Sequence, residues 1–318
     1  MSGAPAEFRL IARHFQPLAG PGALGLLDDA AVVMPPPGRE LVLTADALVE
    51  GVHFLPTDPP DTVAGKLLRV SLSDLAAMGA VPWAYLSTVS VPRTMGDDWF
   101  AAFAAGLARD GAAFGVMLLG GDTTSTPGPV SLSLTLLGHV APGHALRRTG
   151  AQPGHEVWIT GTVGDGALGL LALQGQVPDP DGWLASRYRT PQPRVALGMA
   201  LHGIAAACMD VSDGLVQDLG HLCRAGSVGA DLWLDAVPLS PQARAAGPAW
   251  RERCVTGGDD YELLMAVPPD HAAALRQVAE ASGVAVTRIG TFTPGEGARV
   301  MDGAGQAVPV ARPGWSHF

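Results

Sequence analysis

A carboxylate falls on the apolar face of a helix that the sequence predicts from Asp61 onward. At 3.6 residues per turn, one stripe of this helix contains Leu67, Val70, Asp74 and Met78. An unpaired buried carboxylate costs several kcal/mol unless it is protonated, paired or bound to a cation. The alternative is an aspartate near a helix end that is hydrogen-bonded to backbone, and Asp74 alone does not decide between the two.

Other aspartates share this setting among small or apolar residues. Their motifs are Leu26-Leu-Asp-Asp-Ala30, Leu43-Thr-Ala-Asp-Ala47, Leu119-Gly-Gly-Asp-Thr-Thr124, Met209-Asp-Val-Ser-Asp-Gly214 and Thr256-Gly-Gly-Asp-Asp-Tyr-Glu262. Aspartate is normally a surface residue, and several of these motifs are flanked by glycine, which allows close backbone approach. Each motif alone also fits a solvated turn. Together they favour oxygen ligands for hard divalent cations.

The length of 318 residues and the 47% hydrophobic content suit two domains. The apolar pattern lapses between 141 and 153, so we predict domains 1–145 and 146–318. A formal charge of -10 argues against nucleic-acid binding. Three cysteines match neither a disulfide framework nor a zinc site, and neither a signal peptide nor a membrane span is recognisable. We therefore expect a cytoplasmic protein without membrane contact.

Strands and helices mix without strict alternation, which predicts an α/β or α+β fold of two domains, not one doubly wound sheet. Predicted helices are 7–15, the helix from 61, 97–114, 167–173, 193–202, 214–224 and 271–281. Predicted strands are 41–44, 85–91, 116–119, 130–136, 157–160, 261–267 and 284–292. Ser212 is expected to cap the helix 214–224, with Asp213 in its first turn. Gly121 and Asp122 are expected at a strand end.

Other nucleotide and catalytic signatures are weak. The run Gly164-Asp-Gly-Ala-Leu-Gly169 matches a dinucleotide fingerprint, but no strand ending in an acidic residue follows about 20 residues later. Gly65-Lys66 is followed by leucine, so the chain has no Walker A loop, and it has no nucleophile elbow. Any nucleotide is therefore expected to bind through metals and loops.

Taken together, the motifs resemble those of the thiamine-monophosphate kinases, a family in the superfamily of aminoimidazole ribonucleotide synthetase. Besides the motifs above, the resemblance includes His53-Phe54 and runs from Glu7-Phe8 to His317-Phe318. Leu27 stands where the family usually has glycine. Trp315 stands where relatives often carry tyrosine. The resemblance implies a homodimer in which strands of both N-terminal domains close a shared β-barrel.

The resemblance also implies site residues, position by position. Magnesium ligands, direct or through water, would be Asp29, Thr44, Asp46, Asp74, Asp122, Asp210 and Asp213. ATP would contact Gly121, Asp122, Arg148 and Ser212. The thiamine phosphate would contact His53, Asp260 and Trp315. Without the resemblance, His53 would be interpreted as a histidine of a surface loop and Arg148 as a charged residue of the linker between the domains.

The expected reaction is ATP-dependent phosphorylation of thiamine monophosphate to thiamine diphosphate with several Mg²⁺ ions. A phosphate acceptor already carries about -1.5 to -2 charge at pH 7, so no general base is needed and we expect direct in-line transfer. Rival readings are an ATP-dependent ligase of the same superfamily and a nucleotide-sensing or metal-binding protein without turnover. Selenophosphate synthetase uses an N-terminal selenocysteine or cysteine, and the hydrogenase maturation dehydratase uses a C-terminal cysteine. This chain has neither.

Overall fold

The computed structural model describes residues 6–316, so the predicted motif end at His317-Phe318 lies outside the described residues. The chain divides into two compact units. The N-terminal unit contains Met1–Leu75 and Val81–Gly143, and the C-terminal unit contains Ala76–Ala80 and His144–Phe318. Among the helices of residues 6–316, none combines the length and apolarity that a membrane span requires.

The N-terminal unit is built on a four-stranded sheet in the order β1-β4-β2-β3. Its strands are β1 (Glu40–Val49), β2 (Val81–Val91), β3 (Met117–Ser125) and β4 (Ser131–Val140). Its helices are α1 (Ala6–Leu10), η1 (Ile11–Phe15), η2 (Gln16–Leu18), η3 (Leu24–Leu26), α2 (Pro60–Ala77) and α3 (Asp97–Phe114). Strand β4 is antiparallel to both β1 and β2, whereas β2 and β3 are parallel.

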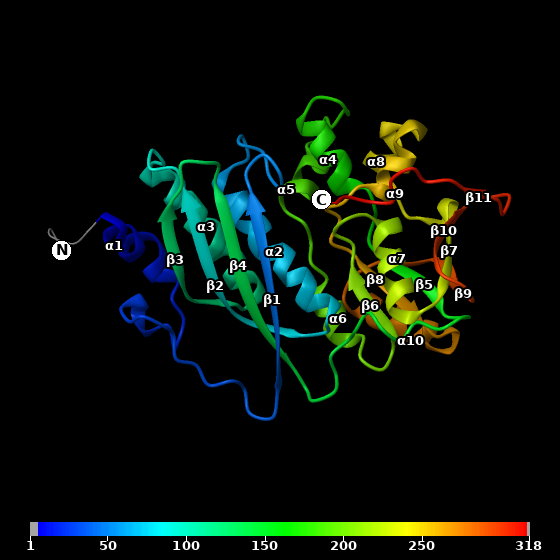
Figure 1. The fold of residues 1–318 in the computed structure, drawn as a ribbon, viewed down its shortest axis with the longest axis horizontal. Coiled ribbons are helices and arrows are strands. Elements are labelled where there is room, and N and C mark those ends of the chain that lie inside the picture. The colour runs from blue at the N-terminus through cyan, green and yellow to red at the C-terminus, as the bar shows by residue number, and fades with distance from the viewer. Residues whose placement is uncertain (1–5, 317–318) are drawn as a thin grey trace. The chain divides into compact units, whose positions relative to one another are not determined.

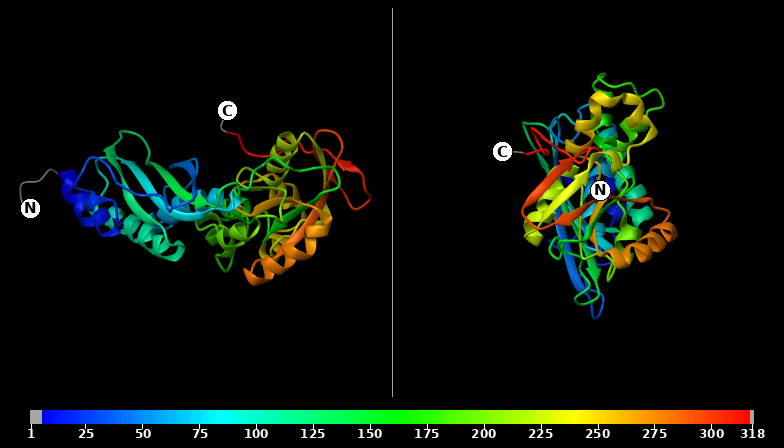
Figure 2. Two further views of the ribbon diagram at one scale, coloured as in Figure 1. Left: turned by 90° about the horizontal axis from the view of Figure 1, so that it is seen from below. Right: turned by 90° about the vertical axis from the view of Figure 1, so that its right-hand side faces the viewer.

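Alternating side chains give this sheet one covered face and one open face. In β4, Leu132, Leu134 and Leu136 are buried, and the residues between them are half-buried. Helices α2 and α3 cover one face of the sheet (Figures 1 and 2). On β1 the alternation leaves Leu43 60% exposed. The open face is therefore partly apolar.

The expectation that Gly121 and Asp122 lie at a strand end is wrong, because β3 continues to Ser125. The strand continues because β2 and β3 pair in parallel as far as Val91 and Ser125, past a register shift at Tyr85/Leu86. A Cβ atom on Gly121 would lie 1.8 Å from the carbonyl oxygen of Ser87, so only glycine fits.

The C-terminal unit contains a seven-stranded sheet in the order β11-β10-β7-β9-β5-β8-β6. Its strands are β5 (Glu156–Thr160), β6 (Ala207–Asp210), β7 (Gly229–Trp233), β8 (Leu263–Val267), β9 (Val286–Thr293), β10 (Gly297–Met301) and β11 (Ala307–Val308). Its longer helices are α4 (Asp165–Leu173), α5 (Trp183–Arg189), α6 (Val195–Ala200), α7 (Leu215–Gly226), α8 (Pro241–Ala246), α9 (Arg251–Thr256) and α10 (Ala272–Ala281). Single turns are η4 (Leu234–Ala236), η5 (Pro248–Trp250) and η6 (Pro269–His271).

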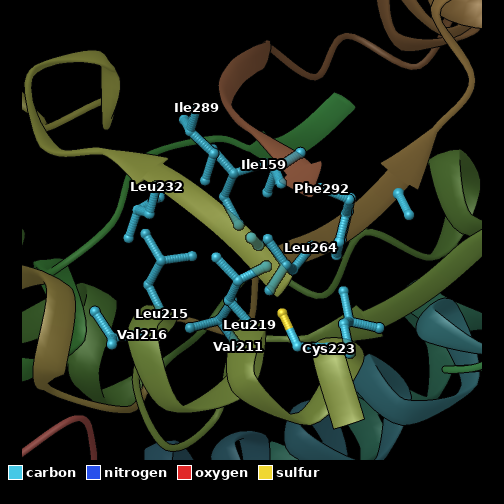
Figure 3. Close-up of a cluster of buried hydrophobic side chains, with 14 of the residues drawn as sticks. Ile159, Val211, Leu215, Val216, Leu219, Cys223, Leu232, Leu264, Ile289 and Phe292 are labelled. Atoms are coloured by element: carbon cyan, nitrogen blue, oxygen red, sulfur yellow. The ribbon is translucent and has the colours of Figure 1, made fainter. Parts of the chain in front are cut away.

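Both faces of this sheet are buried. Figure 3 shows one core, where Leu215 and Leu219 of α7 meet Ile159, Leu264 and Ile289 of the sheet. A second core gathers residues of α6 and α10 with other strand residues. Every residue of β8 is consequently buried. Pairing is antiparallel except between β7 and β10, so the prediction of a mixed fold without a doubly wound sheet is confirmed.

Candidate active site

The first group of predicted ligands lies where β1 meets α2. The Thr44 hydroxyl donates a hydrogen bond to the Asp74 carboxylate, and the Ser71 hydroxyl donates to Asp46 at 2.7 Å. Burial raises the pKa of Asp46, and the hydrogen bond from Ser71 opposes that shift. Asp74 is half-buried in the last turn of α2, so it is less enclosed than the helical stripe predicted. These carboxylates and hydroxyls form an all-oxygen donor set, which suits Mg²⁺.

A second group lines a cavity of about 720 Å³ in the N-terminal unit. The cavity includes Asp28, Asp29, Gly121 and Asp122, whereas Thr44, Asp46 and Asp74 do not line it. The three aspartates are exposed. Phe8, Ile11, Phe15 and Leu118 line the same cavity, which therefore has apolar as well as acidic walls.

His53 lies in the turn after β1. Its Nδ1 accepts a hydrogen bond of 2.9 Å from the Val49 N–H, so Nε2 carries the proton of the neutral ring. The Lys66 Nζ, which is almost fully buried, donates to the His53 carbonyl at 2.9 Å. These bonds fix the loop that presents His53.

In the C-terminal unit, Asp210 ends β6 and is buried, and a tight loop from Ser212 to Gly214 follows. The expectation that Ser212 caps the next helix is wrong. Helix α7 begins at Leu215 after Gly214, and one carboxylate oxygen of Asp218 accepts the N–H groups of Ser212, Asp213 and Gly214 at 3.1 Å each. Because Asp218 holds the backbone, the side chains of Ser212 and Asp213 do not serve as the cap.

The structure brings other predicted residues to this loop. The Asp213 carbonyl accepts the Trp315 N–H at 2.9 Å, and Trp315 is 51% exposed. Ligand atoms of Asp213, Asp218 and His221 lie within 4.8 Å of one another. Burial lowers the pKa of His221, as do the neighbouring charges of Arg224 and Arg148. Arg148, predicted to contact ATP, is therefore one of the charges that act on His221.

Asp260, predicted to contact the thiamine phosphate, is enclosed by backbone donors. It is 1% exposed, and its carboxylate accepts the N–H groups of Gly164 at 2.7 Å and Gly166 at 3.2 Å. Burial raises its pKa well above the ordinary value. Asp259 instead is half-buried with a left-handed φ of 72°, and its N–H donates to the Ser212 carbonyl at 2.9 Å. The Asp259 carboxylate accepts a hydrogen bond from the Tyr261 hydroxyl at 3.2 Å, and it is less enclosed than that of Asp260.

The glycine run from Gly164 to Gly169 is structural. It follows β5, but β5 is antiparallel to both neighbours, so the βαβ unit of a dinucleotide site is missing there. A Cβ on Gly166 would lie 2.2 Å from the Asp259 carbonyl oxygen, and one on Gly169 would lie 2.1 Å from that of Leu184. The glycines allow close packing, and two of them donate to Asp260.

Sequence reasoning missed Asp218, which holds the loop 212–214, and did not distinguish Asp259, Asp260 and Glu262 by their burial. A signal existed for Asp218, which shares a stripe with Leu215, Leu219 and Leu222, as Asp74 does with its neighbours. Asp259 and Glu262 stood within a recognised motif, but alternation alone did not say which carboxylate points inward.

Comparisons with known proteins agree along nearly the whole chain. The family described as AIR synthase related protein, N-terminal domain, matches residues 27–140, and its C-terminal domain matches 152–303. The thiamine-monophosphate kinase of Caulobacter vibrioides is 46% identical over 321 residues, covering 98% of this chain and 91% of that protein.

Solved structures agree with this assignment. A crystal structure of thiamine-monophosphate kinase from Stenotrophomonas maltophilia has 40% identity and a TM-score of 0.86, covering 95% of this chain and 98% of that one. A structure described as AaThiL complexed with AMPPCP and TMP has 29% identity and a TM-score of 0.78, covering 93% and 97%. The resemblance predicted from the motifs is confirmed. The chain belongs to the thiamine-monophosphate kinase family of AIR synthase related proteins.

Proposed function

We propose that this protein transfers the γ-phosphoryl group of ATP to thiamine monophosphate, producing thiamine diphosphate. The observation that carries the proposal is the 46% identity to a thiamine-monophosphate kinase over 98% of the chain. A related structure with AMPPCP and TMP bound supports the two substrates. The half 1–145 would hold ATP and Mg²⁺ and dimerise, and 146–318 would complete the site.

Oxygen-rich residues in both halves suit the binding of Mg²⁺ with polyphosphate. The proposed ligands are Asp29, Thr44, Asp46, Asp74, Asp122, Asp210 and Asp213. Bound Mg²⁺ would neutralise phosphate charge and align donor with acceptor. The chain's own contribution is to hold these carboxylates in position, through Thr44 and Ser71 in one unit and through Asp218 in the other.

The proposed substrate contacts are those that the family resemblance implies, with one change. We assign Gly121, Asp122, Arg148 and Ser212 to ATP. Gly121 and Asp122 line the cavity, which supports this assignment. His53 and Trp315 keep their proposed contact with the thiamine phosphate. We replace Asp260 by Asp259 in that role, because the Asp260 carboxylate is enclosed by backbone donors. The acceptor phosphate is already an anion, so in-line attack needs no general base.

We test this function with ADP formation in the presence of ATP and Mg²⁺. ADP release should require thiamine monophosphate, and chromatography should find thiamine diphosphate in equal amount. Free thiamine should not react appreciably, because an alcohol must lose its proton during attack and a positioned base usually contributes about 10²–10⁴-fold. Comparable turnover of thiamine would contradict the base-free mechanism, and ADP formation without any acceptor would favour a different activity.

We also propose a homodimer formed through β1. This strand is a sheet edge, and its open face exposes Leu41 at 39% and Leu43 at 60%. An edge strand with exposed apolar residues requires cover. Light scattering at micromolar concentration should give twice the chain mass, and Leu43→Glu should give the monomer. A monomeric parent would contradict the dimer without affecting the assigned reaction.

We place the protein in the cytoplasm. Cys208, Cys223 and Cys254 are all free and buried, as is common in reducing compartments. Labelling of fractionated cells with an antibody would test this placement, and recovery outside the cytoplasmic fraction would contradict it.

A further inference from the structure

The N-terminal helices contribute an apolar wall to the cavity that also contains Asp29 and Asp122. Phe8 of α1 and Ile11 and Phe15 of η1 line this wall. Phe15 is buried, whereas Phe8 is 61% exposed. An aromatic ring with that much free surface at a cavity can stack against a flat ligand.

This wall is fastened to the rest of its unit. His14 Nε2 lies 2.7 Å from Asp97 Oδ1, and Arg13 pairs with the same carboxylate at 3.0 Å. The His14 ring also stacks against Phe100 of α3. The Gly20 N–H donates to the Leu118 carbonyl of β3 at 2.9 Å. The wall is therefore in position before a ligand arrives, which reduces the entropy lost on binding.

The apolar and acidic parts of the cavity are spaced along β3. The Leu118 carbonyl accepts the Gly20 N–H, so Leu118 lies beside the chain that follows the N-terminal helices. Asp122 lies four residues after Leu118, which corresponds to about 13 Å along a strand. A nucleoside triphosphate has the same polarity, with an apolar base at one end and phosphates that bind metal at the other. An apolar ligand would leave the acidic end without a partner, and inorganic polyphosphate would leave the apolar end empty.

We propose that Phe8 is a stacking platform for the adenine ring of ATP, with the triphosphate directed toward Asp122. This inference rests on the proposed function, because it takes ATP as the phosphoryl donor. Stacking of a base on an aromatic side chain typically contributes enough to change affinity by tenfold or more. Phe8 recognises the base by its flat face, so any purine nucleotide benefits.

The experiment compares Phe8→Ala and Phe8→Tyr with the parent and with Met34→Ala. Met34 is 85% exposed in the stretch between η3 and β1 and does not line the cavity, so it is the control. Phe8→Ala should raise the KM for ATP and the Kd for ADP by about tenfold, with the KM for thiamine monophosphate within about twofold. Phe8→Tyr should retain parental values because it keeps the ring, and Met34→Ala should match the parent.

Inorganic tripolyphosphate with Mg²⁺ separates stacking from a structural effect. Its Kd should not change in Phe8→Ala, because it has no base. An unchanged Kd for ADP, equal weakening of ADP and tripolyphosphate, or a parent that binds no ADP would each overturn the inference. The ADP titration needs no turnover, so a parent that binds ADP but does not phosphorylate thiamine monophosphate would contradict only the proposed function.

Discussion

Three aspartates at the cavity of the N-terminal unit are exposed, whereas several acidic residues of the C-terminal unit are enclosed by hydrogen-bond donors. Asp28, Asp29 and Asp122 are exposed around a cavity. Asp165 and Glu262, by contrast, are 0% exposed. Glu262 accepts hydrogen bonds from Arg187, Arg194 and Thr160. An aspartate next to glycine is therefore exposed at a cavity in one unit, as Asp122 is, and enclosed by hydrogen-bond donors in the other, as Asp165 is.

The difference follows from what surrounds each carboxylate. A carboxylate that already accepts two or three hydrogen bonds has few lone pairs left for a metal ion. One that accepts a single hydroxyl, as Asp46 does from Ser71, retains free oxygen lone pairs. The hydrogen-bond partners and the exposure of a carboxylate thus distinguish a candidate metal ligand from a buried structural residue. The local sequence motif does not.

The largest effect is expected for Asp74→Asn. The substitution removes a ligand charge and nearly keeps the shape, so turnover should fall at least about 10³-fold, in line with the several kcal/mol that a bound metal contributes. The variant should remain folded. Steady-state kinetics with Mg²⁺ and a thermal melt measure both. Asp61→Asn, which removes a charge from the first turn of the same helix, is the control and should retain activity.

Normal turnover of Asp74→Asn would contradict the ligand role. Loss of activity together with unfolding would instead give Asp74 a structural role, like that of Asp165 and Glu262 in the C-terminal unit. Either result would remove the contrast between the two units at this position.

Glu262→Gln tests the opposite end of the comparison. Arg187 and Arg194 lie 3.0 Å and 2.5 Å from the Glu262 carboxylate, and both are mostly buried. Removing the charge leaves two cations uncompensated, so the free energy of unfolding should fall by about 3–5 kcal/mol. Urea unfolding followed by tryptophan fluorescence measures the loss.

The control for Glu262→Gln is Asp235→Asn, which breaks an exposed pair with Arg251. Its cost should stay below about 1 kcal/mol. Equal costs for the two variants would show that burial does not distinguish these ion pairs.

A third test uses the adjacent Asp259 and Asp260. Asp259→Asn should raise the KM for thiamine monophosphate about tenfold, since it removes the charge of a charge-assisted contact worth about 1.5 kcal/mol. Asp260→Asn should leave that KM nearly unchanged. It should lower the free energy of unfolding by about 1–3 kcal/mol, because its amide group faces a backbone donor. The reverse pattern in substrate kinetics would restore Asp260 as the contact.

The sequence predicts elements well where the pattern is local and long. Helix α3 runs from Asp97 to Phe114 as predicted, because its apolar period persists over its length and Gly115 adopts a left-handed conformation at its end. Strand β6 was missed because its four residues gain their structure from pairing with β8. The strand predicted from Tyr261 begins at Leu263, since Tyr261 has a φ of 53°.

The motifs of the candidate site can be recognised in the sequence, whereas the burial of each carboxylate within a motif cannot. Spacing and residue type single out Asp74 and Asp213, and the structure gives each an arrangement suited to a ligand. The inward turn of Asp260 depends on N–H groups almost 100 residues away, at Gly164 and Gly166. Contacts between residues so far apart in the chain produce no periodic pattern in the local sequence, so they cannot be predicted from it.

The smallest expected effect is the pH dependence of stability caused by Asp165. Its carboxylate accepts the hydroxyls of Ser240 and Thr162 at 2.5 Å each. Burial raises its pKa, and these hydrogen bonds oppose that shift. Because the folded protein holds this proton more tightly than the unfolded chain, the free energy of unfolding should fall as pH rises from the ordinary value of 3.8 through the raised pKa.

Asp165→Asn removes this titration while keeping one acceptor and adding a donor for the two hydroxyls. Urea midpoints measured as pH rises from the ordinary value of 3.8 should therefore decline less steeply in the variant than in the parent. Asp235→Asn, an exposed carboxylate in the same unit, should give a profile parallel to that of the parent. A parallel profile for Asp165→Asn would mean that folding does not change the pKa of the buried Asp165. Asp165 would then differ from the exposed carboxylates of the N-terminal unit in its hydrogen-bond partners but not in its protonation.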